Sequence, residues 1–215
     1  MPDSKERIAS RLRRVPKQER SRERIDDILK VAGDLIGKNG IDSVTMKEIA
    51  ALSGGPIASI YQYFPNKSAI VASLYERFST DVLGLIRKCV IGIDCPEAVY
   101  SAAERLIDSY ADMIRNDPYL QDLINAIRAD KGLSDMYIGR SRTYSTAFSD
   151  MTNHLVPEAF HQQYGRSVHL MVHLVADTVR LSNLTDEAEG TQMIDDFKLL
   201  MRAQLGRYYD ANCST

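Results

Sequence analysis

The sequence predicts an all-α protein with two domains. Three observations support this: apolar residues recur at spacings of three and four through most of the chain, no segment alternates strictly between apolar and polar residues, and turn residues such as Pro96, Gly132 and Pro157 separate the periodic segments. The composition, 44% hydrophobic and 26% charged over 215 residues, is that of ordinary globular domains.

The first helix is predicted near residues 22–38. "KNG" ends it, because Gly40 stands where a helix commonly turns into the left-handed conformation. The stripe that defines its apolar face consists of Ile25, Ile28, Leu29, Ala32, Leu35 and Ile36.

A second helix is predicted to start at Thr45. Thr45 followed three residues later by Glu48 forms a capping box, and Val44 and Ile49 stand where a hydrophobic staple packs. This helix ends near Leu52, where "SGG" interrupts it.

A third short helix is predicted at about residues 56–63. Pro56 suits the first helical position, and Pro65 disfavours helical geometry at Phe64. Helices this short are unstable alone, so both must pack on the helix at 22–38. The arrangement predicts an N-terminal three-helix domain containing a helix-turn-helix.

The rest of the chain is predicted to be helical. Asn66 is a good N-cap for a long helix that continues to about residue 90. Further helices are expected near 97–116, 119–129, 133–155, 158–184 and 187–209.

Charge is distributed unevenly. Residues 1–67 carry 13 Lys and Arg against 9 Asp and Glu, whereas the remainder carries 14 against 20. The basic excess is densest at residues 11–24, and Arg13 and Arg14 lie in an N-terminal arm, residues 1–20, that we predict to contact nucleic acid. Two alternatives are a solvated tail and a short helix packed on the body.

The stretch "SGGPIASIYQYFPNK" carries the predicted contact surface. Pro56, Ile57 and Ala58 begin the recognition helix, where base edges are read, and Ile57 is equally compatible with a core position. Tyr61 and Tyr63 can place a ring on a sugar and a hydroxyl on a phosphate, with plain packing as the alternative. Ile60 and Phe64 are four residues apart, so they are predicted to lie on one helix face that points inward.

"TMKEIAALSGGPIASIYQYFPNKSAI" resembles the DNA-binding motif of the TetR family of transcriptional regulators, and the similarity covers about residues 21–81. Where the family usually has an apolar residue followed by Ser or Thr, this chain has Gly55 and Pro56. The resemblance implies phosphate contacts by Tyr61 and Lys67. It implies further DNA contacts by Thr45, Lys47, Pro56, Ile57, Ala58 and Tyr63.

The resemblance also implies that residues 82–215 form a helical regulatory domain that binds a small ligand and dimerises through its last two long helices. Two apolar stripes at helical spacing suit half of a four-helix bundle completed by a second subunit. The predicted dimer residues are Val168, Val172, Val175, Val179, Ile194, Phe197, Met201 and Leu205.

Candidate ligand-binding residues are aromatic, Met or His side chains of this region, for which plain core packing is the alternative. They are Tyr110, Met113, Tyr119, Leu123, Met136, Tyr144, Phe148, His169 and His173. His169, His173, Asp177 and Arg180 share one helix face. A solvated face or a polar stripe is favoured there over a metal site, so no metal is predicted.

These observations predict a homodimeric DNA-binding transcriptional regulator, a repressor released from a palindromic operator by an unknown small molecule. The alternative is a ligand-independent DNA-binding protein of the same fold with an architectural or cell-division role. We find no nucleophile–base pair and no phosphate loop, so we expect neither an enzyme nor a cofactor. Three widely spaced cysteines, no membrane-length apolar run and a charged N-terminus predict a cytoplasmic protein.

Overall fold

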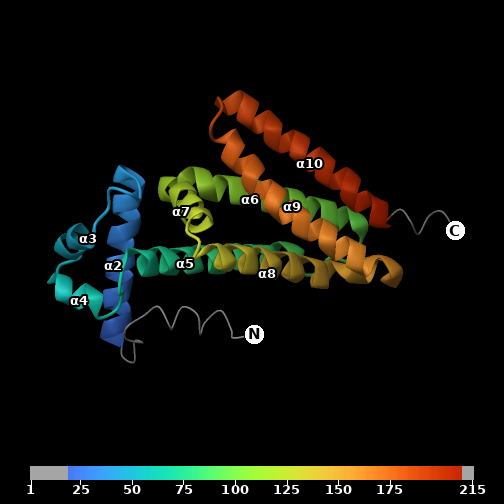
Figure 1. The fold of residues 1–215 in the computed structure, drawn as a ribbon. Coiled ribbons are helices and arrows are strands. Elements are labelled where there is room, and N and C mark those ends of the chain that lie inside the picture. Colours follow the sequence, from blue (N-terminus) through green and yellow to red (C-terminus); the bar gives the residue numbers. More distant parts are fainter. Residues whose placement is uncertain (1–18, 210–215) are drawn as a thin grey trace. The chain divides into compact units, whose positions relative to one another are not determined.

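The computed structural model of the chain describes residues 19–209, and this part is helical without a β-strand, which confirms the all-α prediction (Figure 1). The α-helices are α2 (Glu19–Asn39), α3 (Met46–Leu52), α4 (Ile57–Tyr61), α5 (Lys67–Val90), α6 (Pro96–Asn116), α7 (Pro118–Ala129), α8 (Ser134–Thr152), α9 (His161–Ser182) and α10 (Glu187–Tyr209). Two short 3-10 turns, η1 (Asn153–Leu155) and η2 (Glu158–Phe160), connect α8 to α9.

The chain divides into two compact units. The first contains the residues up to Ser79 together with Asp117–Tyr137, and the second contains Thr80–Asn116 together with the residues from Ile138 onward. Helices α5 and α8 therefore contribute residues to both units. The predicted functional domains, residues 21–81 and 82–215, remain predictions, because compactness alone does not assign a role to α7.

Helix α2 supplies the packing surface of the first unit. Its buried stripe consists of Ile28, Leu29, Ala32, Leu35 and Ile36. On α2, a Cβ added at Gly33 or Gly37 would meet Tyr119 of α7 at 3.7 and 3.4 Å, so these glycines let α7 approach closely. The helix is followed by Gly40, whose φ of +74° suits glycine, as the sequence predicts.

The predicted capping box starts α3. The backbone N–H of Glu48 donates to Thr45 Oγ1 at 3.2 Å, and the Glu48 carboxylate accepts from the Thr45 backbone N–H at 2.9 Å. The hydrogen bonds from the Thr45 side chain and backbone lower the pKa of Glu48. Val44 and Ile49 are both buried, as a hydrophobic staple requires. The sequence therefore located this helix start correctly.

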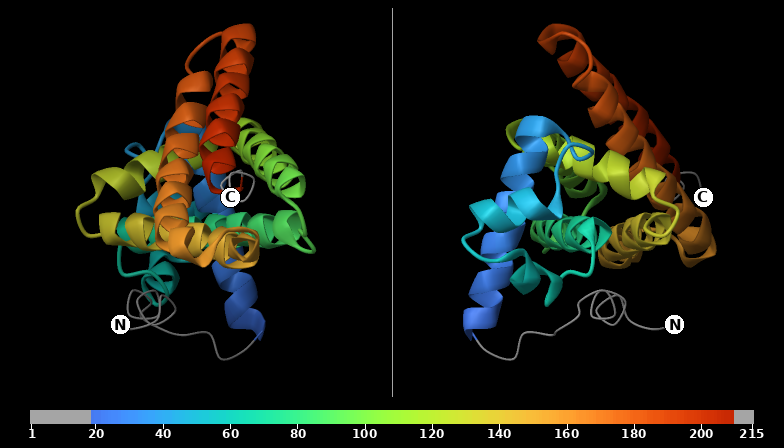
Figure 2. Two further views of the ribbon diagram at one scale, coloured as in Figure 1. Left: turned by 90° about the vertical axis from the view of Figure 1, so that its right-hand side faces the viewer. Right: turned by 60° about the vertical axis from the view of Figure 1, so that its left-hand side comes forward.

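In the second unit, α9 and α10 form an antiparallel hairpin whose helices lie side by side (Figure 2). The facing stripes of the two helices are buried, and they contain Val168, Val179, Ile194, Phe197, Met201 and Leu205. Burial of these side chains, at about 1.5–3 kcal/mol each, is the main stabilisation that holds the hairpin in the unit.

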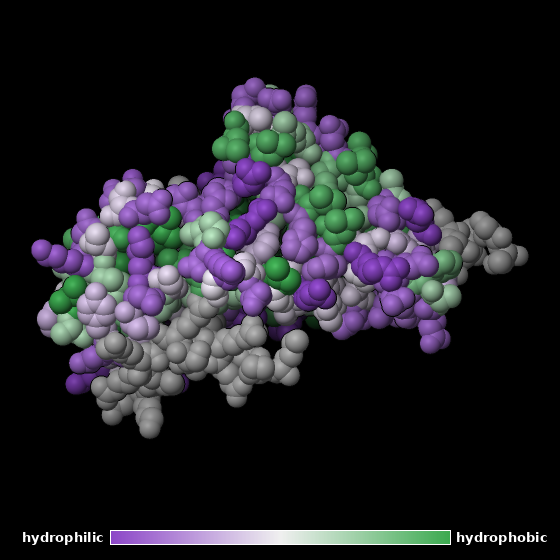
Figure 3. Space-filling model, in the orientation of Figure 1, coloured by the Kyte–Doolittle hydropathy of each residue, from purple (hydrophilic) through white to green (hydrophobic). Residues whose placement is uncertain are grey.

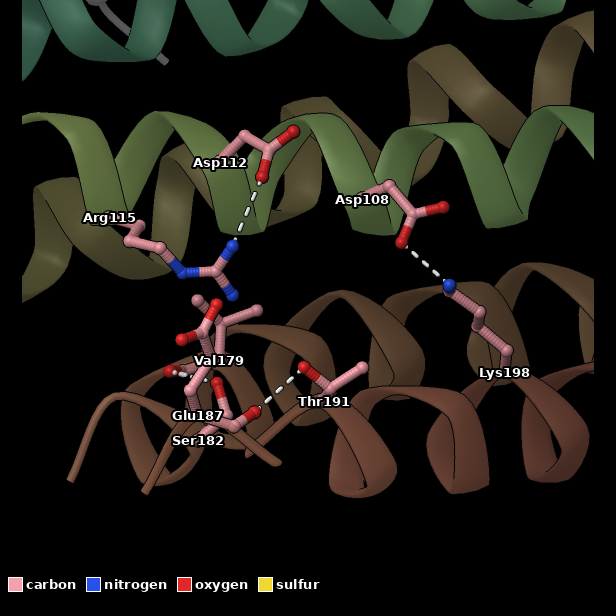
Figure 4. Close-up of polar contacts among 8 residues, drawn as sticks. All are labelled: Asp108, Asp112, Arg115, Val179, Ser182, Glu187, Thr191 and Lys198. Atoms are coloured by element: carbon pink, nitrogen blue, oxygen red, sulfur yellow. Dashed lines mark hydrogen bonds and ion pairs between the residues drawn. The ribbon is translucent and has the colours of Figure 1, made fainter. Parts of the chain in front are cut away.

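Ion pairs add contacts between α10 and α6. Lys198 Nζ lies 2.6 Å from Asp108 Oδ1 on α6 (Figure 4). It also lies 3.0 Å from Asp195 Oδ1 on α10. Burial alone would lower the pKa of Lys198, but the two carboxylates outweigh it and raise the pKa. Arg202 pairs with Glu97 in the same way, one residue after the start of α6.

A tyrosine cluster closes the other end of the hairpin. Tyr164 of α9 is fully buried, and its hydroxyl lies 2.7 Å from Thr152 Oγ1 and 2.8 Å from the hydroxyl of Tyr209. The Tyr164 ring also meets the rings of Tyr208 and Tyr209 edge-on, at centroid distances of 5.4 and 6.0 Å. The cluster therefore joins the start of α9, the end of α8 and the end of α10.

Gly190 is required where α10 passes the end of α9. A Cβ added there would lie 2.5 Å from the carbonyl oxygen of Ser182, which is backbone and cannot move aside easily. We expect Gly190→Ala to lower the free energy of unfolding by about 1–3 kcal/mol, measured by urea denaturation at fixed protein concentration. The control is Gly165→Ala in α9, where an added Cβ meets nothing within 4 Å. That change should be neutral or stabilising, and equal effects of the two would contradict the steric argument.

Candidate nucleic-acid interface

The turn between α3 and α4 produces a helix-turn-helix. Pro56 stands one position earlier than predicted: it is the N-cap of α4, with an extended ψ of 147°, and the helix runs only from Ile57 to Tyr61. The prediction of a recognition helix at about residues 56–63 therefore extends beyond the observed helix at both ends. Ile60 of α4 and Phe64, which follows the helix, are fully buried, which confirms that both side chains face inward.

The opposite face of α4 is exposed, together with the start of α3. Ile57 is 40% exposed, which favours a surface role over the core alternative. Tyr63 is only 8% exposed, so its ring packs inside the unit and leaves little surface for a DNA contact. The predicted contact residues that lie exposed are Thr45, Lys47, Pro56, Ile57, Ala58 and Tyr61. Their roles on DNA stay predictions.

Lys67, which is predicted to contact a phosphate, makes a hydrogen bond within the protein. Its Nζ donates to the backbone carbonyl of Ile41 at 2.8 Å, which ties the start of α5 to the turn after α2. Beside it, Asn66 Oδ1 accepts from the N–H of Ala69 at 2.9 Å, which confirms the predicted N-cap. One backbone N–H group at the start of α5 is therefore already bonded within the protein.

Two predicted DNA contacts, Arg13 and Arg14, lie outside the described residues. The same is true of nearly all of the N-terminal arm, residues 1–20. Its contact with DNA stays a prediction.

Arg24 of α2 is a residue of this region that the sequence reasoning missed. Its guanidinium donates to the backbone carbonyl of Ser53 in the turn, and it lies 3.3 Å from Ser53 Oγ and 3.4 Å from Ser59 Oγ. The available signal was Gly55, a glycine where the resemblance predicts a side chain. A Cβ on Gly55 would lie 2.7 Å from Arg24 Nη2.

The candidate ligand residues are divided between the two units. Tyr119, Leu123 and Met136 belong to the first unit. The second contains Tyr110, Met113, Tyr144, Phe148, His169 and His173. The first unit has an open cavity of about 510 Å³, bounded by residues that include Lys67, Asp122 and Asp130, but none of the nine candidates lines it. Their ligand-binding role stays a prediction.

Two Ser–His pairs connect α8 with α9 in the second unit. Ser141 Oγ lies 3.0 Å from His173 Nε2, and Ser145 Oγ lies 3.2 Å from His169 Nδ1. Each serine hydroxyl donates to a backbone carbonyl one turn earlier on α8, so each oxygen accepts from the imidazole N–H. The imidazole rings contact edge-on at 4.9 Å. His169 and His173 of the polar face therefore pack against α8, whereas the side chains of Asp177 and Arg180 are 43% and 39% exposed.

The predicted dimer stripe faces the inside of the chain. Six of its residues, Val168, Val179, Ile194, Phe197, Met201 and Leu205, are at most 8% exposed, and Val172 and Val175 are half-buried. These side chains pack α9 against α10 and the rest of their unit, and their role at a dimer interface stays a prediction. The sequence pattern correctly identified an apolar stripe, but it could not show whether the stripe meets the same chain or another one.

A second apolar stripe on the same helices is exposed. Leu170, Leu174 and Leu181 on α9 are 45–59% exposed, and their spacing of four and seven places them on one helix face. Leu199 and Leu200 on α10 are 66% and 68% exposed. Figure 3 shows hydrophobic side chains gathered over α9 and α10 on the viewed face. We call these five residues the leucine face. Its sequence signal was the leucine spacing in "HLMVHLVADTVRL".

Residues 19–209 carry neither a candidate metal site nor a candidate membrane span. No group of three or more His, Cys, Asp or Glu side chains is arranged to hold a metal ion there. No helix in this range is long and apolar enough to cross a membrane.

The fold is similar to solved structures of regulators. The fatty acid degradation regulator FadR from Bacillus halodurans superposes with a TM-score of 0.65 at 16% identity, covering 82% of this chain and 97% of that one. The TetR family repressor AlkX from Dietzia sp. gives 0.61 at 17% identity, covering 86% and 97%. SmeT in complex with triclosan gives 0.61 at 14% identity, covering 86% and 90%. No curated protein matches the sequence significantly.

Two family models match the sequence, one in its N-terminal part and one in its C-terminal part. Residues 28–74, which contain the helix-turn-helix, match the model for bacterial regulatory proteins of the tetR family. Residues 97–209, more than half of the chain, match the tetracyclin repressor-like C-terminal domain. The capping box of α3 and the exposed face of α4 agree with these matches. The chain belongs to the tetR family of bacterial regulatory proteins, which bind DNA through a helix-turn-helix.

Proposed function

We propose that the protein is a homodimeric repressor that binds a palindromic operator and is released from it by a small molecule. The observation that carries the proposal is the leucine face on α9 and α10. Leu170, Leu174 and Leu181 form an exposed apolar face of α9, whose opposite side is buried in the chain, and monomeric proteins rarely leave large apolar patches uncovered. A second copy of the hairpin would bury the leucine face and form a four-helix bundle.

A dimer accounts for how so short a recognition helix binds specifically. Two copies of α4 must enter successive major grooves, about 34–36 Å apart on one face of the duplex. The exposed Ile57 and Ala58 can contact thymine methyl groups, and Tyr61 can donate its hydroxyl to a phosphate. Because none of these side chains discriminates strongly alone, specificity comes from the paired half-sites and from DNA shape.

Repression and release by a ligand are supported by two proteins of similar fold and by side chains of the second unit. AlkX is described as a repressor, and SmeT was solved with the small molecule triclosan bound. In this chain, Tyr144 and Phe148 on α8 are buried close in sequence to Ser141 and Ser145, so apolar and hydrogen-bonding groups share one helix. A ligand that binds one arrangement of these helices more tightly would shift the population toward a dimer whose recognition helices no longer match the operator.

The proposal is tested with the full-length protein and operator duplexes obtained by selection from random sequence. We expect the selected site to be palindromic, and we expect Tyr61→Phe to weaken operator binding about fivefold, because one hydrogen bond to a charged phosphate oxygen is lost. Fluorescence anisotropy measures the affinity. The thermal midpoint should be unchanged, since Tyr61 is exposed. Selection of a site without symmetry, or unchanged affinity of Tyr61→Phe, would contradict the proposed binding mode.

A further inference from the structure

Gly55 and Arg24 occupy one site at the helix-turn-helix. The hypothetical Cβ of Gly55 would lie 2.7 Å from Arg24 Nη2, well inside van der Waals contact, and 3.4 Å from Arg24 Cζ. Gly55 is not needed for a left-handed backbone, since the positive φ in this turn belongs to Gly54. The missing side chain at position 55 is therefore explained by the space that the guanidinium occupies.

The guanidinium bonds both sides of the turn. It donates to the carbonyl of Ser53 at the end of α3, and it lies within 3.4 Å of Ser59 Oγ, in α4. The Ser59 hydroxyl itself donates to the carbonyl of Pro56 at 2.8 Å, so its oxygen is free to accept from Arg24. A planar guanidinium with several fixed donors suits such a bridge better than the single ammonium of Lys.

This bridge compensates for what α4 lacks. The helix is only five residues long, and its N-cap, Pro56, supplies no side-chain hydrogen bond. Such a helix has little stability of its own, so its direction depends on neighbouring contacts. One apolar anchor is Ile60, buried on the inner side. Arg24 supplies a polar anchor nearer the N-terminal end, which is the end that enters the groove.

We propose that Arg24 is a positioning residue for the recognition helix: its guanidinium, lodged in the space left by Gly55, fixes the direction of α4 and so determines operator specificity without contacting a base. The inference rests on the proposed operator binding. Loss of the bridge leaves the exposed residues in place but lets α4 change its angle in the groove. Binding to operator then falls, whereas binding to unrelated DNA, which depends on phosphate contacts, is retained.

The test compares full-length variants on the selected operator and on an unrelated duplex of equal length, at several salt concentrations. We expect Arg24→Ala to weaken operator binding on the order of tenfold, with the unrelated duplex and the salt dependence unchanged. The matched control is Arg22→Ala, which removes the same charge from an exposed position on the same helix. It should leave the ratio of the two affinities unchanged. Equal weakening on both duplexes by Arg24→Ala, with a flatter salt dependence, would show a phosphate contact and overturn the proposal.

A double-mutant cycle separates the bridge from a general loss of stability. Gly55→Ala alone should displace the guanidinium and weaken operator binding about as much as Arg24→Ala. In the Arg24→Ala background, the same change should have no further effect, because the clashing group is gone. Additive losses would refute the link between the two residues. If the wild type shows no preference for any duplex, the proposed function fails; if it does and both variants bind like wild type, only this inference fails.

Discussion

Replacing Leu170 and Leu174 with glutamate should convert the protein into folded monomers that hold a palindromic operator about 10²- to 10⁴-fold more weakly, because two linked half-site contacts become independent ones. Both leucines are exposed, at 59% and 45%, so charged side chains are tolerated in the isolated chain. In a dimer, two copies would place four carboxylates in an apolar contact, which disfavours association strongly. Sedimentation measures the oligomeric state, and anisotropy measures operator affinity.

Two control variants show whether the effect belongs to the leucine face. Ile91→Glu introduces the same charge at an exposed apolar residue between α5 and α6, and it should remain dimeric with normal affinity. Phe197→Glu alters the originally predicted stripe, and it should unfold the second unit rather than yield folded monomers, because Phe197 is buried in the chain. A dimeric Leu170→Glu/Leu174→Glu variant would place the interface elsewhere.

Tyr164→Ala should destabilise the second unit by about 3–5 kcal/mol, the usual loss for a buried aromatic side chain. Tyr164 is fully buried, and its removal also leaves the hydroxyls of Thr152 and Tyr209 without their shared partner. The free energy of unfolding is measured by urea denaturation at fixed protein concentration, since the proposed dimer makes apparent stability concentration-dependent. A loss below about 1 kcal/mol would contradict the central packing role of this ring.

Tyr164→Phe isolates the hydroxyl, and it should cost about 1 kcal/mol. It also carries a pH signature. Burial raises the pKa of Tyr164 and of Tyr209, so the folded state keeps phenol protons that the unfolded chain releases near its ordinary value of about 10. Because the folded state then binds more protons, stability is fully present below about pH 10 and falls as the pH rises above it. The phenylalanine variant should show a shallower alkaline loss than wild type.

The sequence predicted local structure well because the signals are local. The capping box at Thr45 and Glu48, the stop at Gly40 and the cap at Asn66 each depend on residues within one helical turn, and all three are present in the structure. The all-α fold followed from the same kind of pattern. The recognition helix was predicted too long, since Pro56 serves as its cap, and the helices predicted at 133–155 and 158–184 include residues that form the 3-10 turns η1 and η2.

The candidate sites were less predictable because they depend on which elements meet. Helical spacing identified the apolar stripe around Phe197. It could not show that the stripe packs inside the chain, because that depends on how α6 and α8 pack against the hairpin. The Arg24–Gly55 contact joins residues 31 positions apart, and no local pattern marks it beyond an unexplained glycine. Assignment of α7 to the first unit likewise follows from Tyr119 fitting against two glycines of α2.

The tyrosine cluster makes the second unit optically distinguishable. The chain contains 11 tyrosines and no tryptophan, so its intrinsic ultraviolet emission comes from tyrosine alone. Tyr100, Tyr164, Tyr208 and Tyr209 contact one another in the second unit, with ring centroids 5.4–6.0 Å apart in the three closest pairs. The hydroxyls of Tyr164 and Tyr209 also lie 2.8 Å apart. A single tryptophan introduced on the exposed surface of α3 would therefore emit at a wavelength that no native residue uses, and the helix-turn-helix could be followed on DNA separately from the unfolding of the hairpin.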